Sequence, residues 1–180
     1  MLRALRGEIR MVNRRNLIGV GLILPMAASS AFAKRRDPSN PMIGTWSLID
    51  ATTVFKDGNT TPLNGKAGPY SGIIMYQNNG MMAVQIAYPR KEIAHEADFE
   101  KMPADQRLPY LDTYYAYFGR YEFDRAASIV HHFVQSSLDP SEIGIHYLRS
   151  VALKGDVVTL TTIPNEADPK SHNVLSWRRL

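Results

Sequence analysis

Residues 72–88 read GIIMYQNNGMMAVQIAY, two short apolar runs on either side of a polar turn. The dipeptide Asn79-Gly80 is a strong signal for a tight hairpin, because both residue types accept the positive φ that such a turn requires. The pattern predicts that a strand at 72–77 folds back onto a second strand at 81–88. This hairpin points to a structure built from antiparallel sheet.

Similar short strand-like runs continue along the chain, separated by turns that contain glycine, proline, asparagine or aspartate. Their number and spacing are typical of an all-β sandwich or barrel. We expect eight strands, at residues 44–55, 72–77, 81–88, 120–124, 128–138, 144–153, 157–163 and 174–179.

A break of about 30 residues after Tyr88 is longer than a hairpin loop requires. Within it, Pro109 suits the first position of a helix and Gly119 suits a C-terminal cap. Four aromatic side chains would fall on one stripe of that helix, namely Tyr110, Tyr114, Tyr117 and Phe118. We therefore predict one short helix, at about 109–118, that caps an end of a small barrel.

The first 33 residues have the pattern of an export leader. Five arginines accompany the apolar run LIGVGLILPM, and the motif AFA at 31–33 fits a small-x-small cleavage site. The apolar run is too short to span a bilayer stably. The segment NRRNLI resembles the twin-arginine pattern, with general secretion as the alternative. We expect a cleavable signal peptide at 1–33, a linker at 34–43, one domain at 44–180, and a periplasmic or secreted location.

Charge and cysteine content exclude several functions. The chain has 21 basic and 17 acidic residues, of which the leader holds five arginines and one glutamate, so 16 of each sign remain after cleavage. Without a basic excess there is no electrostatic basis for binding nucleic acid or an anionic membrane surface. The chain has no cysteine, which excludes disulfides, a thiolate nucleophile and cysteine-based metal sites.

Five segments, taken in their order along the chain, resemble the bacterial and fungal lipocalin-like domains of the calycin superfamily. They are GTWSLID from residue 44, GIIMYQNNGMMAVQI from 72, YYAYFGRYEFD from 114, VHHFVQSSLDP from 130 and LSWRR from 175. The resemblance covers most of the chain after the leader, and the leader points to an exported bacterial member. It implies an eight-stranded antiparallel barrel whose interior holds a small hydrophobic molecule.

The same resemblance implies how one end of the barrel is closed. In lipocalins an arginine of the last strand packs across the tryptophan of the first strand, here Trp46. Both Arg178 and Arg179 are placed for this structural role. Neighbouring strand residues point to opposite faces, so only one of the two should reach the indole.

Two adjacent histidines on the predicted strand 128–138 are the most chemically informative residues. Because side chains alternate along a strand, His131 and His132 point in opposite directions and cannot bind one metal together. The face that contains His132 has the smoother apolar run, so we favour His132 inside the barrel. There it would be either a hydrogen-bonded lining residue or a ligand contact and candidate general base.

Other polar residues on predicted strands or on the helix could also contact a ligand. Arg149 lies on a largely apolar face, where a guanidinium needs an anionic partner from the protein or the ligand. Gln85 is a polar residue on an apolar strand, and buried tyrosine hydroxyls tend to find a polar partner. The predicted ligand-binding set is Gln85, Tyr114, Tyr117, Arg120, Glu122, His132 and Arg149.

These features lead to one main functional hypothesis and two rivals. The main one is a barrel that binds a small hydrophobic molecule, with acidic molecules among the candidates. The rivals are a cofactor-independent isomerase or cyclase that uses the same cavity, and a packed barrel with a structural or partner-binding role. We expect no cofactor and no metal, because the five histidines lack close ligand spacing and no phosphate-binding loop or nucleophile elbow is present. The oligomeric state stays open.

Overall fold

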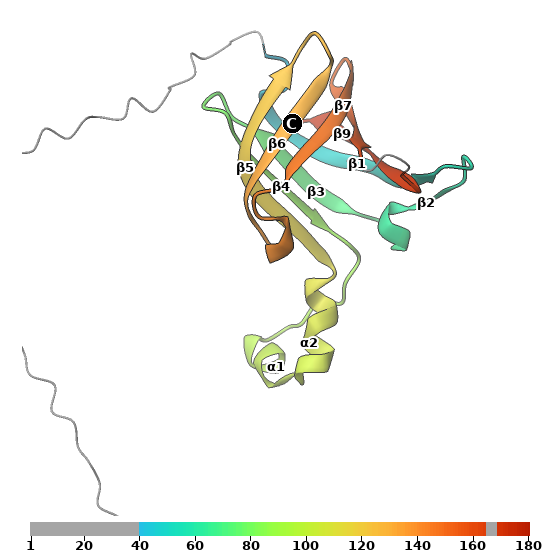
Figure 1. Cartoon of the computed structure of the whole chain (residues 1–180). Coiled ribbons are helices and arrows are strands. Elements are labelled where there is room, and N and C mark those ends of the chain that lie inside the picture. Colours follow the sequence, from blue (N-terminus) through green and yellow to red (C-terminus); the bar gives the residue numbers. More distant parts are fainter. Residues whose placement is uncertain (1–39, 165–168) are drawn as a thin grey trace, which may run out of the picture. The chain divides into compact units, whose positions relative to one another are not determined.

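A closed antiparallel sheet organises the chain in this computed structural model, which describes residues 40–164 and 169–180. The predicted leader at 1–33 and most of the predicted linker at 34–43 lie outside the described residues. The strands are β1 (Gly44–Phe55), β2 (Thr60–Pro62), β3 (Ser71–Tyr76), β4 (Met81–Ala87), β5 (Tyr114–Asp124), β6 (Ile129–Ser137), β7 (His146–Lys154), β8 (Val157–Ile163) and β9 (Ser171–Arg179). The helices are η1 (Leu63–Gly65), α1 (Glu96–Lys101), α2 (Ala104–Leu111) and η2 (Pro140–Glu142) (Figure 1).

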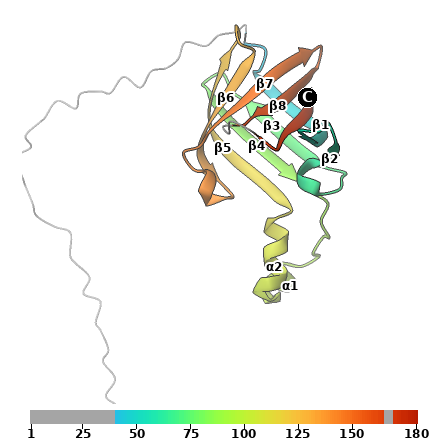
Figure 2. The same ribbon diagram turned by 45° about the vertical axis from the view of Figure 1, so that its right-hand side comes forward.

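The sheet closes into a barrel because β1 pairs with both of its long neighbours. The strand order is β2-β1-β3-β4-β5-β6-β7-β8-β9, and β1 also pairs with β9 along most of its length. β2 pairs only with the second half of β1, so the other eight strands make up the ring (Figures 1 and 2). The predicted eight-stranded antiparallel barrel is confirmed, and β2 is a short addition that the sequence pattern missed.

Alternation along the strands determines which side chains fill the interior. In the predicted hairpin, Ile74 pairs with Val84, and Gly80 takes the positive φ of 80° that its turn requires. The buried side chains of this hairpin are Ile74, Tyr76, Met82, Val84 and Ile86, every second residue of each strand. The interior of the barrel is therefore the hydrophobic core of the domain.

The predicted helix is present, but it lies earlier in the chain. The longer helix is α2, and the aromatic segment 114–118 forms the first half of β5 instead. In that strand Tyr117 pairs with Val84 of β4. Aromatic residues favour strands when a partner strand is available, and the proline and glycine signals on which the prediction rested are local and cannot register that partner.

Gly119 is a close-packing residue of the sheet and does not cap a helix. It sits where the pairing of β5 with β6 shifts register. A Cβ at this position would lie 2.0 Å from the carbonyl oxygen of Phe133. Only glycine lets the two backbones approach this closely.

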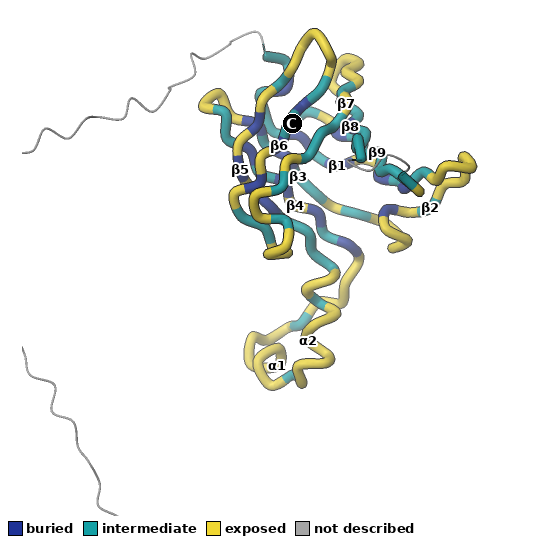
Figure 3. The backbone as a smooth tube through the Cα atoms, viewed as in Figure 1, coloured by how far each residue is buried: buried dark blue, intermediate teal, exposed yellow. Residues whose placement is uncertain are grey.

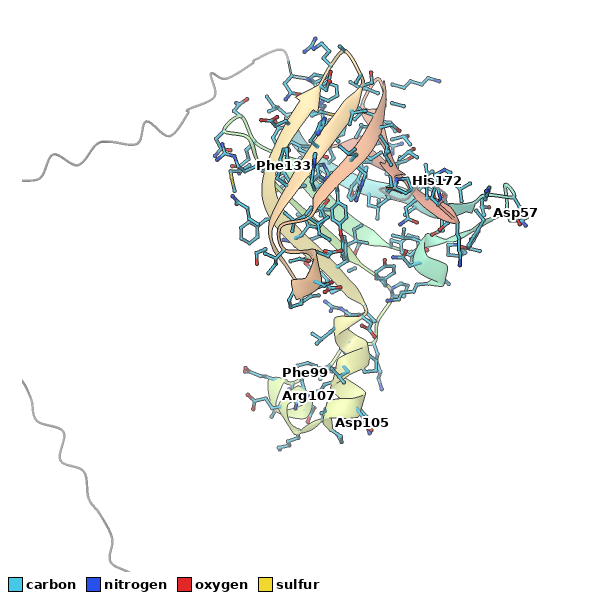
Figure 4. The ribbon with its side chains drawn as sticks, viewed as in Figure 1. Asp57, Phe99, Asp105, Arg107, Phe133 and His172 are labelled. Carbon is cyan, nitrogen blue, oxygen red and sulfur yellow. The ribbon has the colours of Figure 1, made fainter. Side chains whose placement is uncertain are left out.

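The sequence predicts that the aromatic stripe of a helix caps an end of the barrel. In the structure the two helices contribute no buried aromatic side chain to the barrel. Neither α1 nor α2 contains a buried residue, and Figure 3 shows the buried positions on the barrel strands. Figure 4 shows Phe99, Asp105 and Arg107 on the helices, away from the barrel. Among the described residues no helix is long and apolar enough to cross a membrane.

One end of the barrel is closed by Trp46 and Arg179. The indole of Trp46 is fully buried, and its N–H donates to the carbonyl oxygen of Met42 at 2.9 Å. The guanidinium of Arg179 lies 3.9 Å from the centre of the indole ring and donates to the carbonyl oxygens of Ile43 at 2.7 Å and Pro41 at 2.6 Å. Arg178 points outward, where its Nε lies 3.6 Å from a carboxylate oxygen of Asp156. One of the two arginines reaches the indole, as strand alternation predicts.

Replacing Arg179 with methionine should lower the free energy of unfolding by about 2 kcal/mol or more, because a cation over an indole and two charged hydrogen bonds are lost. The matched control is Arg178→Met, which removes an exposed ion pair and should change stability by less than about 0.5 kcal/mol. Urea unfolding measures both values. Equal effects of the two substitutions would contradict this role for Arg179.

Candidate functional site

The barrel interior is partly hollow. A cavity of about 380 Å³ opens among β3, β4, β5, β6, β7, β8 and β9. Its apolar wall is formed mainly by Ile74, Val84, Ile86, Leu160 and Leu175. A small number of polar side chains interrupt this wall, and they determine what the cavity can bind.

His132 lies in the cavity wall, between two tyrosines. It is 1 % exposed, and alternation along β6 places it opposite His131. The Nε2 atom lies 2.8 Å from the hydroxyl oxygen of Tyr76, and the Nδ1 atom lies 2.7 Å from that of Tyr117. The prediction that His132 faces the interior is therefore correct. His131 lies on the other face, where its Nδ1 atom is 3.0 Å from Nε2 of His146.

Burial keeps His132 uncharged. Its pKa is well below the usual value of 6.5, first because the charged form would lose its hydration and then because the charged form is disfavoured by electrostatic interaction with Arg149, followed by His131 and His146. A neutral imidazole has one N–H donor and one acceptor nitrogen. His132 therefore accepts a hydrogen bond from one tyrosine and donates one to the other.

The direction of these two hydrogen bonds follows from the surroundings of Tyr76. That side chain is buried, and among the described residues its hydroxyl has no hydrogen-bond partner except His132. The Tyr76 hydroxyl must therefore donate to Nε2, because its proton would otherwise be buried without an acceptor. The Nδ1–H of His132 then donates to the oxygen of Tyr117. This leaves the Tyr117 hydroxyl proton free to point into the cavity, whose wall includes Tyr117.

The Tyr117 hydroxyl is suited to donate a hydrogen bond and does not ionise easily. Burial raises the pKa of its hydroxyl far above the usual value of 10, and the cation of Arg149 only partly opposes this effect. The hydroxyl therefore stays protonated at any physiological pH. It can donate to a ligand oxygen or to a developing negative charge.

Arg149 brings a positive charge to the cavity. It lies in the middle of β7, beside Val130 of β6 and Thr162 of β8. Its Nη1 donates to the carbonyl oxygen of Leu148 at 3.0 Å, and the guanidinium stacks on the ring of Tyr147 at 4.7 Å. No ion pair involving Arg149 is found within residues 40–164 and 169–180. A guanidinium has five N–H donors, so most of those of Arg149 remain open to a ligand.

Glu142 is a cavity residue that the sequence did not single out. It lies in η2, just after β6. One carboxylate oxygen accepts hydrogen bonds from the hydroxyls of Tyr115 at 3.0 Å and Tyr147 at 2.8 Å, and the other accepts one from Ser137 at 2.7 Å. Burial, followed by the interaction with Glu142, raises the pKa of Tyr147 to about 12. The charge of this carboxylate is thus already stabilised by three donors.

A second polar group in the cavity wall was also missed. Asn173 accepts a hydrogen bond from the hydroxyl of Thr53 at 2.8 Å, and that hydroxyl in turn accepts one from the backbone N–H of Asn64 at 3.0 Å. The side-chain amide of Asn64 donates to the Tyr88 hydroxyl at 3.1 Å. These residues come from β1, β9, η1 and the position directly after β4. Nothing in local sequence patterns indicates that they meet.

Only three of the seven predicted ligand-binding residues line the cavity, namely Tyr117, His132 and Arg149. The other four, Gln85, Tyr114, Arg120 and Glu122, lie outside its lining, so the structure does not bring them to this cavity. Gln85 and Tyr114 contact each other at an exposed position, where the tyrosine hydroxyl donates to Oε1 at 2.7 Å. Arg120 and Glu122 are exposed on β5, because the inward positions of that strand belong to Tyr117 and Tyr121.

The described residues form no metal site, either in the cavity or on the outer face of the barrel. No group of three or more histidine, aspartate, glutamate or cysteine side chains that could hold an ion occurs among them. The close pair of His131 and His146 stacks with Phe133 on the outer face. Two ligands are fewer than a stable zinc site uses.

His132 should make the protein less stable in mild acid. The folded state holds it neutral, whereas the unfolded chain takes up a proton below about pH 6.5, so the free energy of unfolding should fall by up to about 1.4 kcal/mol per pH unit below that value. Above pH 6.5 the residue is neutral in both states and contributes no slope. Replacing it with glutamine should flatten the stability profile between pH 6.5 and 5, as measured by urea unfolding.

The control for this prediction is His95→Gln, at an exposed position, which should leave the profile unchanged. Identical slopes for the wild type and the His132→Gln variant would mean that His132 is charged when folded.

Comparison with known proteins identifies the family. A family model described as a lipocalin-like domain matches residues 43–180. No curated protein matches the chain. Among solved structures, a crystal structure of a mutant of the fluorescent protein UnaG is similar, with 14% identity, a TM-score of 0.33, and coverage of 76% of this chain and 94% of that chain. Because the family model spans well over half of the sequence, this chain belongs to the lipocalin-like domain family.

Proposed function

We propose that this protein is an exported binding protein whose barrel holds a small, largely hydrophobic molecule with an acidic group. The observation that carries the proposal is the cavity of about 380 Å³, in which Arg149 interrupts a mostly apolar and aromatic wall. Small-molecule sites usually have volumes of about 300–1,000 Å³ and a few polar groups that orient the ligand. This cavity has both properties.

Arg149 is the reason to expect an acid. Arg149 is half-buried in a largely apolar wall, where a guanidinium is better stabilised when an anion pairs with it. The contacts described for Arg149 are a backbone carbonyl and a tyrosine ring, and neither carries a full negative charge. A ligand carboxylate would supply the missing charge and could accept two parallel hydrogen bonds from the guanidinium.

Glu142 restricts where the acidic group can lie. This carboxylate lines the same cavity, and its oxygens are occupied by Tyr115, Tyr147 and Ser137. It would repel a second carboxylate placed beside it. The ligand acid should therefore lie against Arg149 and the Tyr117 hydroxyl, with its apolar part along Ile74, Val84 and Leu160.

The two rival functions have less support. An isomerase or cyclase that used His132 as its base would need a free nitrogen within reach of a substrate proton, and both nitrogens of His132 contact tyrosines. Its lowered pKa also makes it a weak base. A barrel filled with side chains, with a structural or partner-binding role, fits poorly with the cavity volume.

The proposal of export rests on the leader alone. The arginines, the apolar run and the AFA motif of residues 1–33 support cleavage and a periplasmic or secreted location. The NRRNLI segment supports the twin-arginine route, in which the barrel would fold before transport. An exported binding protein would meet its ligand outside the cytoplasm.

Replacing Arg149 with methionine should weaken binding of dodecanoate by roughly tenfold or more, because a charged hydrogen-bonded pair is lost. Binding of dodecanol, which has the same chain but no charge, should change little. Isothermal titration calorimetry gives, for each probe, the ratio of the dissociation constants of the variant and the wild type.

The matched control is Arg120→Met, which removes an arginine that lies outside the cavity and should leave both affinities unchanged. If Arg149→Met weakened dodecanoate and dodecanol equally, the substitution would have damaged the cavity and the acid-binding role would be wrong.

A further inference from the structure

The indole N–H of Trp177 is a buried hydrogen-bond donor without an acceptor. Trp177 is 1 % exposed and lines the cavity. Its Nε1 is the one buried side-chain nitrogen or oxygen atom without a hydrogen-bond partner in the part of the chain that the structure describes. Unpaired buried donors are rare in folded proteins and call for an explanation.

The other tryptophan shows that this fold can satisfy such a donor. Trp46 is also fully buried, and its indole N–H donates to the carbonyl oxygen of Met42 at 2.9 Å. Trp177 is flanked in the sheet by Leu48 and Val158, whose side chains contain no acceptor. The local structure thus leaves an unpaired donor on a residue that lines the cavity.

We infer that Trp177 is a second ligand-binding residue, and that its indole N–H donates to an oxygen on the apolar body of the ligand. This inference rests on the proposed function and narrows its ligand class. The ligand would be an oxo or hydroxy derivative of an apolar acid, with the acid at Arg149 and the additional oxygen at Trp177.

The balance of donors and acceptors in the cavity supports this class. Arg149 and Trp177 both have N–H groups without described acceptors, and the Tyr117 hydroxyl proton is left free by the Tyr76–His132–Tyr117 hydrogen bonds. The carboxylate of Glu142 is already engaged by three hydroxyl donors. A matching ligand must therefore offer more acceptors than a single carboxylate that binds Arg149.

The donor itself can be observed by nuclear magnetic resonance. The chain has two tryptophans, so the ¹⁵N-labelled protein has two indole N–H signals. Trp177→Phe identifies the signal of Trp177, and that of Trp46 is the internal control. Addition of 2-adamantanone should shift the Trp177 signal downfield, whereas 2-methyleneadamantane, which has the same shape without the oxygen, should not. Because both probes are neutral, this shift tests the Trp177 donor independently of any ion pair with Arg149.

Affinity measurements test the ligand class. Among positional isomers of oxododecanoate, at least one should bind about fivefold or more tightly than dodecanoate, as expected for one added hydrogen bond to a buried donor. In Trp177→Phe this preference should disappear, so that the ratio of the two affinities falls to about one, because only the oxo isomer loses a hydrogen bond. In Arg149→Met the preference should persist although both acids bind more weakly.

The outcomes separate the two proposals. If dodecanoate binds through Arg149 but no oxo isomer binds more tightly and 2-adamantanone leaves the Trp177 signal in place, the inference about Trp177 is wrong and the proposed function stands. If dodecanoate does not depend on Arg149 but the ketone shifts the Trp177 signal, the acid-binding proposal fails and Trp177 is still a donor to ligand oxygen. An equal loss of both acids in Trp177→Phe would also overturn the inference, because it would indicate a purely packing role.

Discussion

The pairing of β1 with β9, closed at one end by Arg179 over Trp46, is the constraint on which the rest of the structure depends. It turns an open sheet into a ring, and a ring has an inside and an outside. Once Trp46 faces inward, strand pairing carries the same choice from strand to strand, through Ile74 and Val84 to Tyr117. A one-residue change of register would exchange the two faces. The closed end thereby determines which polar side chains enter the cavity.

The polar groups inside the barrel fall into two kinds. Glu142 and the hydroxyls around it satisfy one another, as do Asn173, Thr53 and Asn64. Arg149, Tyr117 and Trp177 retain donors that no described residue accepts. His132 is itself satisfied, but it affects a donor of the second kind. It accepts from Tyr76 and donates to the oxygen of Tyr117, which leaves the hydroxyl proton of Tyr117 free to point into the cavity. A cavity with surplus donors favours a ligand rich in acceptors, and the charge of Arg149 favours an anionic one.

Sequence patterns predicted the features that depend on strand alternation and turn chemistry. The strands and the hairpin at Asn79-Gly80 follow from these rules. Alternation placed one of the two adjacent histidines inside, and the smoother apolar run favoured His132. The resemblance to lipocalins implied an arginine over Trp46, and alternation limited this role to one of Arg178 and Arg179. Sequence patterns failed for Tyr114, which was assigned to a helix from a nearby proline and glycine, because pairing with β4 overrides local preference. They also failed for Glu142 and Asn173, whose roles arise only when distant segments meet. Trp177 carries no local signal at all, since an unpaired donor is a property of its surroundings.

The central claim is that the closed barrel has a hollow interior that holds one small acidic molecule. Native mass spectrometry of the protein purified from its own host tests this claim most directly. The account predicts a species heavier than the polypeptide by the mass of one small molecule, which organic extraction at low pH releases as an apolar, oxygenated acid. A preparation that shows only the mass of the bare polypeptide, and gains none when dodecanoate or its oxo derivatives are added, would contradict it.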